Sequence, residues 1–261
     1  MDLSNLKIAF FTRSMNYSLF KLSDNTISLP FKHYRLTYTT AQGYLDKILN
    51  YDIDYAINID EDAFVIDNDA LLQLLEYCIS EKIVNCGMRD GGVLPIRNGN
   101  PVVTNPFFNI LDVKAIKKDF SKDTVAKFIN KEIDYSKNVP KNLPFKYEIT
   151  TNYEPFYPFF IWLNTNYKVL YLNVKEHDDT FTTIVYNQVN QPILFHSWHS
   201  RSFGIDEFHT NRINNLYKAC IDKELDFSLF EKLTIAVEKF NNQKLIPFIL
   251  PIRRFFKQII K

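Results

Sequence analysis

The chain has 261 residues, which is enough for one large domain with a sizeable hydrophobic core. Hydrophobic residues make up 46% of it and charged residues 23%, the balance of an ordinary soluble globular protein. The formal net charge is only +1, so the chain has no basic surplus to neutralise phosphates, and we expect no nucleic-acid partner.

The cysteines and the apolar runs bear on the compartment. Cys78, Cys86 and Cys220 lack the spacing of a metal or redox motif, which favours a reducing environment. The first residues show no signal peptide, and no apolar run reaches the roughly 18 residues of a spanning helix. We therefore expect a cytoplasmic protein.

The first half of the chain alternates strand and helix patterns. Short apolar runs predict strands, and apolar residues at helical spacing predict helices. The predicted strands cover residues 6–11, 55–59, 83–87 and 109–113, the predicted helices cover residues 38–49 and 70–80, and residues 14–30 form a polar stretch that we expect to be irregular. Asp67 is in position to cap the second helix. This alternation predicts an α/β fold with one central sheet, mixed but mostly parallel, flanked by helices.

The second half mixes element types. Residues 116–142 are rich in charge and predict a helical insertion at the surface. Tyr153-Glu154-Pro155 marks the start of a helix that carries the aromatic residues 156–163 through the interior, because proline is favoured in a first turn. Further strands are predicted at residues 167–174, 182–186 and 192–195. We expect one domain over residues 1–240 and a basic amphipathic tail over residues 241–261.

Apolar and basic residues of this tail fall on different faces of a predicted helix. The apolar face holds Ile252, Phe255, Phe256, Ile259 and Ile260, and the basic face holds Arg253, Arg254, Lys257 and Lys261. No acidic residue occurs from Lys244 onward. The pattern is typical of a helix at an anionic membrane surface. A terminal helix that packs its apolar face on the domain has the same pattern.

The most informative segment is the acidic triplet Asp60-Glu61-Asp62, which directly follows the apolar strand at residues 55–59. The carboxyl ends of central strands are where open α/β sheets bind ligands. Residues at i and i+2 can point the same way where a strand ends, so Asp60 and Asp62 can share one hard cation, Mn²⁺ or Mg²⁺. The alternative is a solvated turn before a helix cap.

A second polar segment follows the strand predicted at residues 192–195. It reads His196-Ser197-Trp198-His199-Ser200-Arg201. Neutral imidazole suits Mn²⁺, and the guanidinium of Arg201 can bind a diphosphate with two hydrogen bonds. The alternative for each histidine is a core side chain whose hydrogen bonds are satisfied within the protein.

Four segments together resemble bacterial or viral glycosyltransferases of the GT-A fold, over roughly residues 6 to 205. They are Asn58-Ile59-Asp60-Glu61-Asp62, Asp90-Gly91-Gly92, Asn105-Pro106-Phe107-Phe108 and His196 to Arg201. The resemblance implies a single α/β domain that binds a nucleotide-sugar, with a UDP-sugar as the first candidate. It implies that Asp60 and Asp62 bind Mn²⁺ or Mg²⁺ and, through the metal, the donor diphosphate.

The same resemblance implies roles for further residues. His196 is the preferred third metal ligand and His199 the alternative, while Thr12 and Arg13 lie where the family holds the nucleoside. Asp90 and Asn105 are candidates for contacts with the donor or acceptor sugar, and Gly91 and Gly92 let the backbone approach it. The implied acceptor is a glycan or a lipid-linked molecule of cell-surface polysaccharide synthesis, which would place the protein on the cytoplasmic face of a membrane.

An inverting enzyme needs a carboxylate base for the acceptor hydroxyl. Glu154, at the start of the aromatic helix, is our first candidate, and Asp178 and Asp179 are its competitors. For Glu154 the alternative is a carboxylate stabilised by the helix dipole. A retaining enzyme needs no such base. Two other functions remain open from the sequence, a metal-dependent nucleotidyltransferase or phosphoesterase and a non-catalytic carbohydrate- or nucleotide-binding module.

Overall fold

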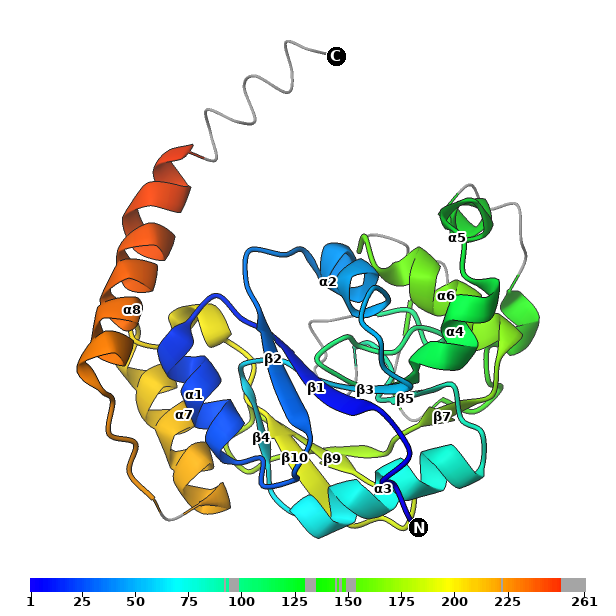
Figure 1. The fold of residues 1–261 in the computed structure, drawn as a ribbon, viewed down its shortest axis with the longest axis horizontal. Coiled ribbons are helices and arrows are strands. Elements are labelled where there is room, and N and C mark those ends of the chain that lie inside the picture. The colour runs from blue at the N-terminus through cyan, green and yellow to red at the C-terminus, as the bar shows by residue number, and fades with distance from the viewer. Residues whose placement is uncertain are drawn as a thin grey trace.

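The computed structural model describes residues 1–91, 93, 99–129, 135–143, 145, 147–148, 154–221 and 223–249. Within these residues a six-stranded sheet in the order β2-β1-β3-β6-β5-β7 forms the centre of the molecule (Figure 1). Its strands are β1 (Ile8–Arg13), β2 (Lys32–Leu36), β3 (Tyr55–Ile59), β5 (Asn85–Gly87), β6 (Phe108–Asp112) and β7 (Val169–Tyr171). β6 runs antiparallel to its neighbours β3 and β5, and the other pairs are parallel. The predicted α/β fold with a mixed, mostly parallel sheet is confirmed.

A second sheet lies beside the first and was not predicted. It is antiparallel, in the order β4-β10-β9-β8, and its strands are β4 (Ala63–Val65), β8 (Val174–Glu176), β9 (Thr183–Tyr186) and β10 (Pro192–His196). The run predicted as one strand at residues 167–174 divides between the two sheets, as β7 and the first residue of β8. The strand that leads to His196 therefore belongs to the antiparallel sheet, and we correct the expectation that it ends in the central one.

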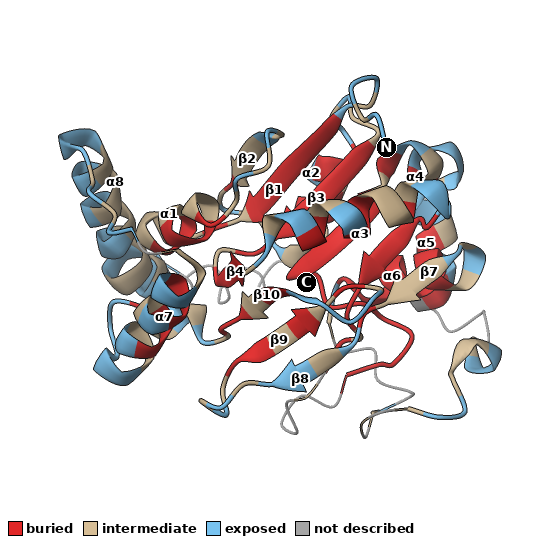
Figure 2. Cartoon of the chain, turned by 90° about the horizontal axis from the view of Figure 1, so that it is seen from below, coloured by how far each residue is buried: buried red, intermediate tan, exposed pale blue. Residues whose placement is uncertain are grey.

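Helices cover both faces of the central sheet. The helices of the described residues are α1 (Tyr17–Asn25), α2 (Ala41–Ile48), α3 (Asn68–Ser80), α4 (Val113–Asp119), α5 (Lys122–Ile129), α6 (Tyr157–Asn166), α7 (Glu207–Cys220) and α8 (Leu229–Phe240). Of these, α2 to α6 pack on the central sheet, α1 and α7 pack on β4 of the second sheet, and α8 lies beside α1. One buried cluster joins the sheet to α3, and another joins it to α2, α4, α5 and α6. Asp67 caps α3 as predicted, with its carboxylate 2.9 Å from the amide nitrogen of Ala70. Figure 2 shows that the central strands are buried along most of their length.

Residues 14–30 contain a helix where an irregular stretch was predicted. Asn16 caps α1 by accepting a hydrogen bond from the amide of Leu19 at 3.2 Å. Only Leu19, Phe20, Leu22 and Ser23 of α1 are buried, so its apolar face is narrow and most of the helix is polar. β2, which follows, is an edge strand with mostly half-buried side chains, and it gives no apolar run.

The C-terminal helices lie at one end of the molecule beside α1 (Figure 1). α8 continues through a π-helical turn, Asn241–Leu245, into helical residues 246–249, so the predicted domain boundary at residue 240 falls inside a continuous helix. Residues 250–261, which hold the basic residues of the predicted tail, lie outside the described residues. No helix in the described part of the chain combines the length and the apolar character that crossing a bilayer requires.

Candidate functional site

The acidic triplet forms the turn between the two sheets. The amide of Asp60 donates to the carbonyl of Phe107 at 2.7 Å, which extends the pairing of β3 with β6 by one residue. The amide of Ala63 then donates to the carbonyl of Asp60 at 3.1 Å, and the chain enters β4. Both Asp60 and Asp62 are buried. Two carboxylates are thus held out of bulk water at the carboxyl end of a central strand.

Pairing of β10 with β4 brings the histidine segment to this turn. His196 is opposite Ala63 in the register, and the amide of Ser197 donates to the carbonyl of Asp62 at 2.9 Å. The imidazole Nε2 of His196 lies 3.6 Å from Oδ1 of Asp62. The two segments that the sequence predicts as metal ligands therefore meet, although they are far apart in the chain.

Aromatic rings fix the orientation of this imidazole. The ring of His196 stacks on Phe107 with centroids 3.8 Å apart and planes 4° apart, and Trp198 lies on it at 4.0 Å. Nδ1 of His196 and Oδ1 of Asp60 are buried, and neither has a hydrogen-bond partner among the described residues. Unsatisfied buried polar atoms are rare in folded proteins and call for an explanation, of which a bound ion is one.

Arg13 at the end of β1 pairs with the first carboxylate of the triplet. Its Nη2 donates to Oδ2 of Asp60 at 2.8 Å. Burial raises the pKa of Asp60, and the positive charge of Arg13 opposes this rise. For Asp62, burial also acts to raise the pKa, but the imidazole of His196, the charge of Arg13 and a backbone hydrogen bond together outweigh it, so the pKa of Asp62 lies below its usual value. The two carboxyl groups thus differ in their electrostatic environment.

The residues at the triplet fit a hard divalent cation in their chemistry. Carboxylate oxygens with one imidazole nitrogen suit Mn²⁺, and carboxylates suit Mg²⁺. No group of three or more His, Cys, Asp or Glu side chains that could hold a metal occurs among the described residues. Asp62 and His196 already face each other, and Asp60 binds Arg13 through Oδ2 while its Oδ1 has no partner among the described residues.

Thr12, the other residue expected near the nucleoside, is engaged within the fold. Its hydroxyl lies 2.8 Å from Nε2 of His33, and Nδ1 of the same ring lies 2.5 Å from Oδ1 of Asp24. Thr12 is fully buried. The structure therefore places Arg13 at the acid pair and gives the hydroxyl of Thr12 a partner on β2.

Glu61, the middle residue of the triplet, points to a cavity on the side of α8. Its carboxylate accepts hydrogen bonds from the amides of Met15 at 2.9 Å and Asn16 at 2.8 Å, and burial raises the pKa of Glu61 to about 7. The cavity has a volume of about 670 Å³ and is also lined by Arg201 and by residues of α8. Sequence reasoning missed Glu61, although the i, i+2 argument that pairs its neighbours puts it on the opposite side.

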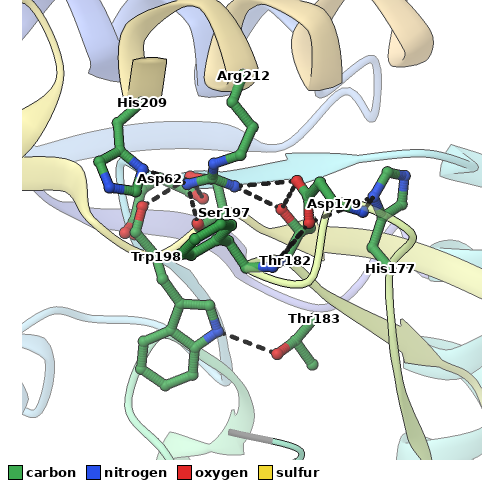
Figure 3. A network of polar contacts seen from close by, with 10 residues as sticks. Asp62, His177, Asp179, Thr182, Thr183, Ser197, Trp198, His209 and Arg212 are labelled. Atoms are coloured by element: carbon green, nitrogen blue, oxygen red, sulfur yellow. Dashed lines mark hydrogen bonds and ion pairs between the residues drawn. The ribbon is translucent and has the colours of Figure 1, made fainter. Parts of the chain in front are cut away.

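Asp179, one candidate base, lies in a network around a buried arginine (Figure 3). Its Oδ2 accepts from the hydroxyl of Thr182 at 2.6 Å and from Nη1 of Arg212 at 3.2 Å. Nη2 of Arg212 donates to the carbonyl of Ser197 at 2.7 Å, next to the contact between Ser197 and Asp62. Burial acts to raise the pKa of Asp179. Hydrogen bonds from the hydroxyl of Thr182, two amides and Arg212 outweigh this effect and hold the pKa below its usual value. Asp178 is exposed.

His199, the alternative metal ligand, lies on another side of the same turn. Trp198 and His199 both have left-handed backbone conformations, with φ of 56° and 54°. The ring of His199 stacks on His209 of α7 at 4.2 Å. Burial lowers the pKa of His199, and the charges of His209 and Arg212 lower it further. Of the two histidines, it is His196 whose ring faces the acid pair.

Asp90, Asn105 and the start of α6 form a buried chain of contacts that ends at His196. Asp90 is fully buried and accepts hydrogen bonds from Nδ2 of Asn105 at 2.6 Å and from the hydroxyl of Tyr157. Oδ1 of Asn105 accepts from the amide of Phe107 at 3.1 Å, and Phe107 stacks on His196. Asp90 and Asn105 therefore position the aromatic support of the imidazole.

Glu154 lies half-buried just before α6, and its carbonyl accepts from the amide of Tyr157 at 3.0 Å. The predicted aromatic helix is present and residues 156–163 are all buried, but its predicted start is wrong: α6 begins at Tyr157, and the proline of its first turn is Pro158 and not Pro155. Gly91 has a φ of 96°, which favours glycine, as the predicted loop requires. Gly92 and Tyr153 lie outside the described residues.

No protein-family model matches the sequence, and a search of curated proteins finds no match. The fold is similar to a mannosyltransferase, PcManGT from Pyrobaculum calidifontis in complex with GDP-Man and Mn²⁺, at 7% identity over 94% of this chain and 72% of that chain, with a TM-score of 0.39. TarS 1-349 of S. aureus in complex with UDP-GlcNAc matches at 10% identity over 67% of this chain and 60% of that chain, with a TM-score of 0.36. A197 from STIV matches at 13% identity over 72% and 94%, also at 0.36. These likenesses concern the fold alone.

Proposed function

We propose that the chain is a metal-dependent glycosyltransferase that moves a sugar from a nucleotide-sugar, with a UDP-sugar as the first candidate, to a hydroxyl of an acceptor. One observation carries this proposal. Asp62 and His196 come from distant segments and face each other 3.6 Å apart beside buried Asp60, and each of Asp60 and His196 holds a buried polar atom that has no partner within the described part of the chain. This donor set at the carboxyl end of a central strand suits a cation that binds a diphosphate.

Sugar transfer requires that negative charge on the departing nucleoside diphosphate be neutralised. Asp60, Asp62 and His196 would hold a Mn²⁺ or Mg²⁺ ion, which would supply the neutralising positive charge. Arg13 lies at the end of β1 next to the acid pair, where it contacts the nucleoside side of the donor. Thr12 is fully buried and bonded to His33, so its role is to support β1 and not to touch the nucleoside. Arg201 is exposed at the cavity beside Glu61 and can bind a phosphate oxygen. His199 remains the second candidate for the metal.

Deprotonation of the acceptor hydroxyl is the other requirement of an inverting transfer. We propose Glu154 as this base. Asp179 is the weaker candidate, because its carboxylate is taken up by Thr182, two amides and Arg212. For Asp179 we propose a positioning role, since Arg212 connects it to Ser197 and so to the turn that carries His196. Asp90 and Asn105 position Phe107 beneath the imidazole, and their proposed effect on the bound sugar is indirect, through that contact.

We propose a glycan or a lipid-linked molecule of cell-surface polysaccharide synthesis as the acceptor. The cavity beside Glu61 has room for part of such a molecule and is bordered by α8 and Arg201. The location that goes with it is the cytoplasmic face of a membrane, with the basic residues of the segment 241–261 directed to anionic lipid.

A thermal-shift panel tests the proposal. Nucleoside diphosphates and nucleotide-sugars are added with Mn²⁺ or with EDTA to the wild type, to Asp62→Ala and to the control Asp69→Ala, whose side chain is exposed on the first turn of α3. A ligand that binds only the folded state raises the melting temperature by mass action. We expect one nucleotide-sugar to stabilise the wild type and Asp69→Ala with Mn²⁺, and not Asp62→Ala. If no nucleotide-sugar stabilises the wild type, the proposal fails.

The same samples separate the competing functions. A glycosyltransferase releases nucleoside diphosphate from its donor, slowly to water and faster to an acceptor. A phosphoesterase or nucleotidyltransferase releases inorganic phosphate, pyrophosphate or nucleoside monophosphate instead. A binding module shows the thermal shift and releases neither product. Chromatography of the nucleotide products therefore assigns the class of reaction.

A further inference from the structure

One side of the C-terminal helix presents a continuous apolar surface to solvent. The exposed fractions are 77% for Phe230, 62% for Leu233 and 60% for Phe240. Spaced three or four residues apart, these side chains and Val237 lie on one face of α8. The surface is extended by Leu229 before them and by Leu245, Phe248 and Ile249 after them. We call these eight residues the α8 apolar face. Figure 2 shows α8 exposed at one end of the molecule.

The opposite side of α8 is polar and holds the helix on the domain. Glu238 accepts hydrogen bonds from the amide of Tyr17 at 2.6 Å and from Nη2 of Arg35 at 2.8 Å. Glu231 accepts from the hydroxyl of Tyr17 at 3.1 Å and lies 3.6 Å from Nζ of Lys21. A helix at the surface of a globular protein normally turns its apolar face inward and its charged face to water. In α8 the charged face is turned inward, and the ion pairs are lost if the helix rotates.

We propose that the α8 apolar face is a docking surface for an anionic lipid bilayer. Its charge favours this occupant. The acidic residues of the segment 229–249 are Glu231 and Glu238, and both point inward to the domain. Lys232, Lys239 and Lys244 are exposed, and the next residues in sequence add Arg253, Arg254, Lys257 and Lys261 with no acid. Apolar side chains flanked by lysine and arginine bind at the interface of anionic membranes.

A second copy of the chain is a poorer partner for the same face. A two-fold interface would bring identical surfaces together, so the exposed Lys232, Lys239 and Lys244 of one copy would border the same residues of the other. Like charges in such an interface repel, whereas anionic headgroups attract each of them. This argument concerns α8 and its charges and does not rest on the proposed sugar transfer.

Docking in this way would bring the cavity beside Glu61 close to the headgroup layer. Ile235, Glu238 and Ile246 on the inner side of the same helix line that cavity. One helix thus separates the cavity from the α8 apolar face. A bilayer on the outer side and the cavity on the inner side would lie about one helix diameter apart, on the order of 10 Å.

Vesicle sedimentation with the full chain tests the proposal. The vesicles are phosphatidylcholine alone or phosphatidylcholine with phosphatidylglycerol. The test variant is Phe230→Ser/Leu233→Ser, and the matched control is Phe208→Ser/Val189→Ser, which removes one exposed aromatic and one exposed aliphatic side chain away from α8. We expect the wild type and the control to bind the anionic vesicles, and the test variant to bind at least about tenfold more weakly.

Two further results decide the matter. Binding to phosphatidylcholine alone should be weaker than to the anionic vesicles by about tenfold or more, because the basic residues add to the apolar attraction. Equal binding of the test variant and the wild type would overturn the proposal. So would a wild type that sediments as a dimer, ignores both vesicles and becomes monomeric in the test variant, since a second copy would then cover the face. All four substituted residues are exposed, so melting temperatures close to that of the wild type check that each variant is folded.

Discussion

Nη2 of Arg13 lies 2.8 Å from Oδ2 of Asp60, and the two residues lie side by side at the carboxyl ends of the adjacent parallel strands β1 and β3. The same strand pairing that builds the centre of the sheet therefore determines the charge balance at the acid pair. Arg13 neutralises one carboxylate of the triplet, and the imidazole of His196 faces the other. A cation that binds both carboxylates competes with the guanidinium for Asp60.

This competition gives the first prediction. Arg13→Met leaves the buried carboxylate of Asp60 without its cation and should lower the free energy of unfolding by about 2–4 kcal/mol, near the lower end of what breaking a buried ion pair costs. Mn²⁺ should then stabilise Arg13→Met more than it stabilises the wild type, because the positive charge of the guanidinium no longer repels the cation. Urea denaturation with and without Mn²⁺ measures both effects. Equal stabilisation of the wild type and Arg13→Met by Mn²⁺ would contradict this competition between Mn²⁺ and Arg13 for the charge of Asp60. An undiminished stabilisation of Arg13→Met/Asp60→Asn by Mn²⁺ would contradict it as well.

The second prediction separates a ligand from its support. His196→Gln should weaken Mn²⁺ binding by more than about tenfold, since losing the groups that orient a ligand already costs 10- to 100-fold. Phe107→Leu keeps the imidazole and removes the ring stacked on it at 3.8 Å, so it should weaken Mn²⁺ binding less than His196→Gln does. Titration calorimetry with Mn²⁺ gives both affinities. His199→Gln serves as the comparison, and a larger loss there than in His196→Gln would transfer the ligand role to His199.

A third prediction concerns the base. Glu154→Gln should reduce kcat of sugar transfer by about 100-fold or more and leave KM for the donor nearly unchanged, as expected for a group that acts in the transition state. Asp179→Asn should reduce kcat less, because the carboxylate of Asp179 is bound by Thr182 and Arg212. Initial rates with the donor identified by the thermal-shift panel provide the measurement. Full activity of Glu154→Gln would remove it as the base.

The fourth prediction is a dependence of stability on pH. Hydrogen bonds and the charge of Arg212 place the folded-state pKa of Asp179 below its usual value of 3.8, so its ionised form stabilises the fold above that value and the stabilisation is lost as the pH falls further. Asp179→Asn should cost about 1–3 kcal/mol at pH 7, where a hydrogen-bonded charge is lost from beside a buried cation.

The difference between wild type and Asp179→Asn should then shrink below about pH 4, where the carboxylate of the unfolded chain is protonated. The groups that face Asp179 are Arg212, with His209 beside it, and His177, whose Nδ1 lies 3.4 Å from Oδ1 of Asp179. Chemical denaturation of both proteins across pH 3.5 to 7 measures the difference. A gap between the two proteins that grows on acidification would show that the sign is wrong.

Local patterns in the sequence were sufficient for the central strands and for the acid turn. β3 is apolar because both of its faces are buried, and the change from Ile59 to Asp60 marks where it leaves the sheet. The cap of α3 at Asp67 follows a rule that involves only neighbouring residues. α1 and β2 were missed because they lie at the edge of the fold and bury few side chains, which makes both segments short and mostly polar.

The parts of the site that depend on non-local pairing were harder to predict. That His196 meets Asp62 follows from the antiparallel pairing of β10 with β4, a strand of three residues that lacks a recognisable pattern of its own. Arg212 lies on a helix beyond the resembling segments, and its contacts to Asp179 and Ser197 come from three separate parts of the chain. Spacing in the sequence carries no signal for such contacts.

The attachment of α8 has a consequence for how the molecule opens. In the described residues, the three buried clusters contain no side chain of α8, so unfolding this helix exposes little apolar core. The free energy that holds it closed comes mainly from polar contacts such as those between Glu238 and Arg35. Segments of this kind open locally, well below the free energy of global unfolding. Amide exchange along α8 will therefore report the strength of a few ion pairs, while exchange in β1 and β3 reports the stability of the whole domain.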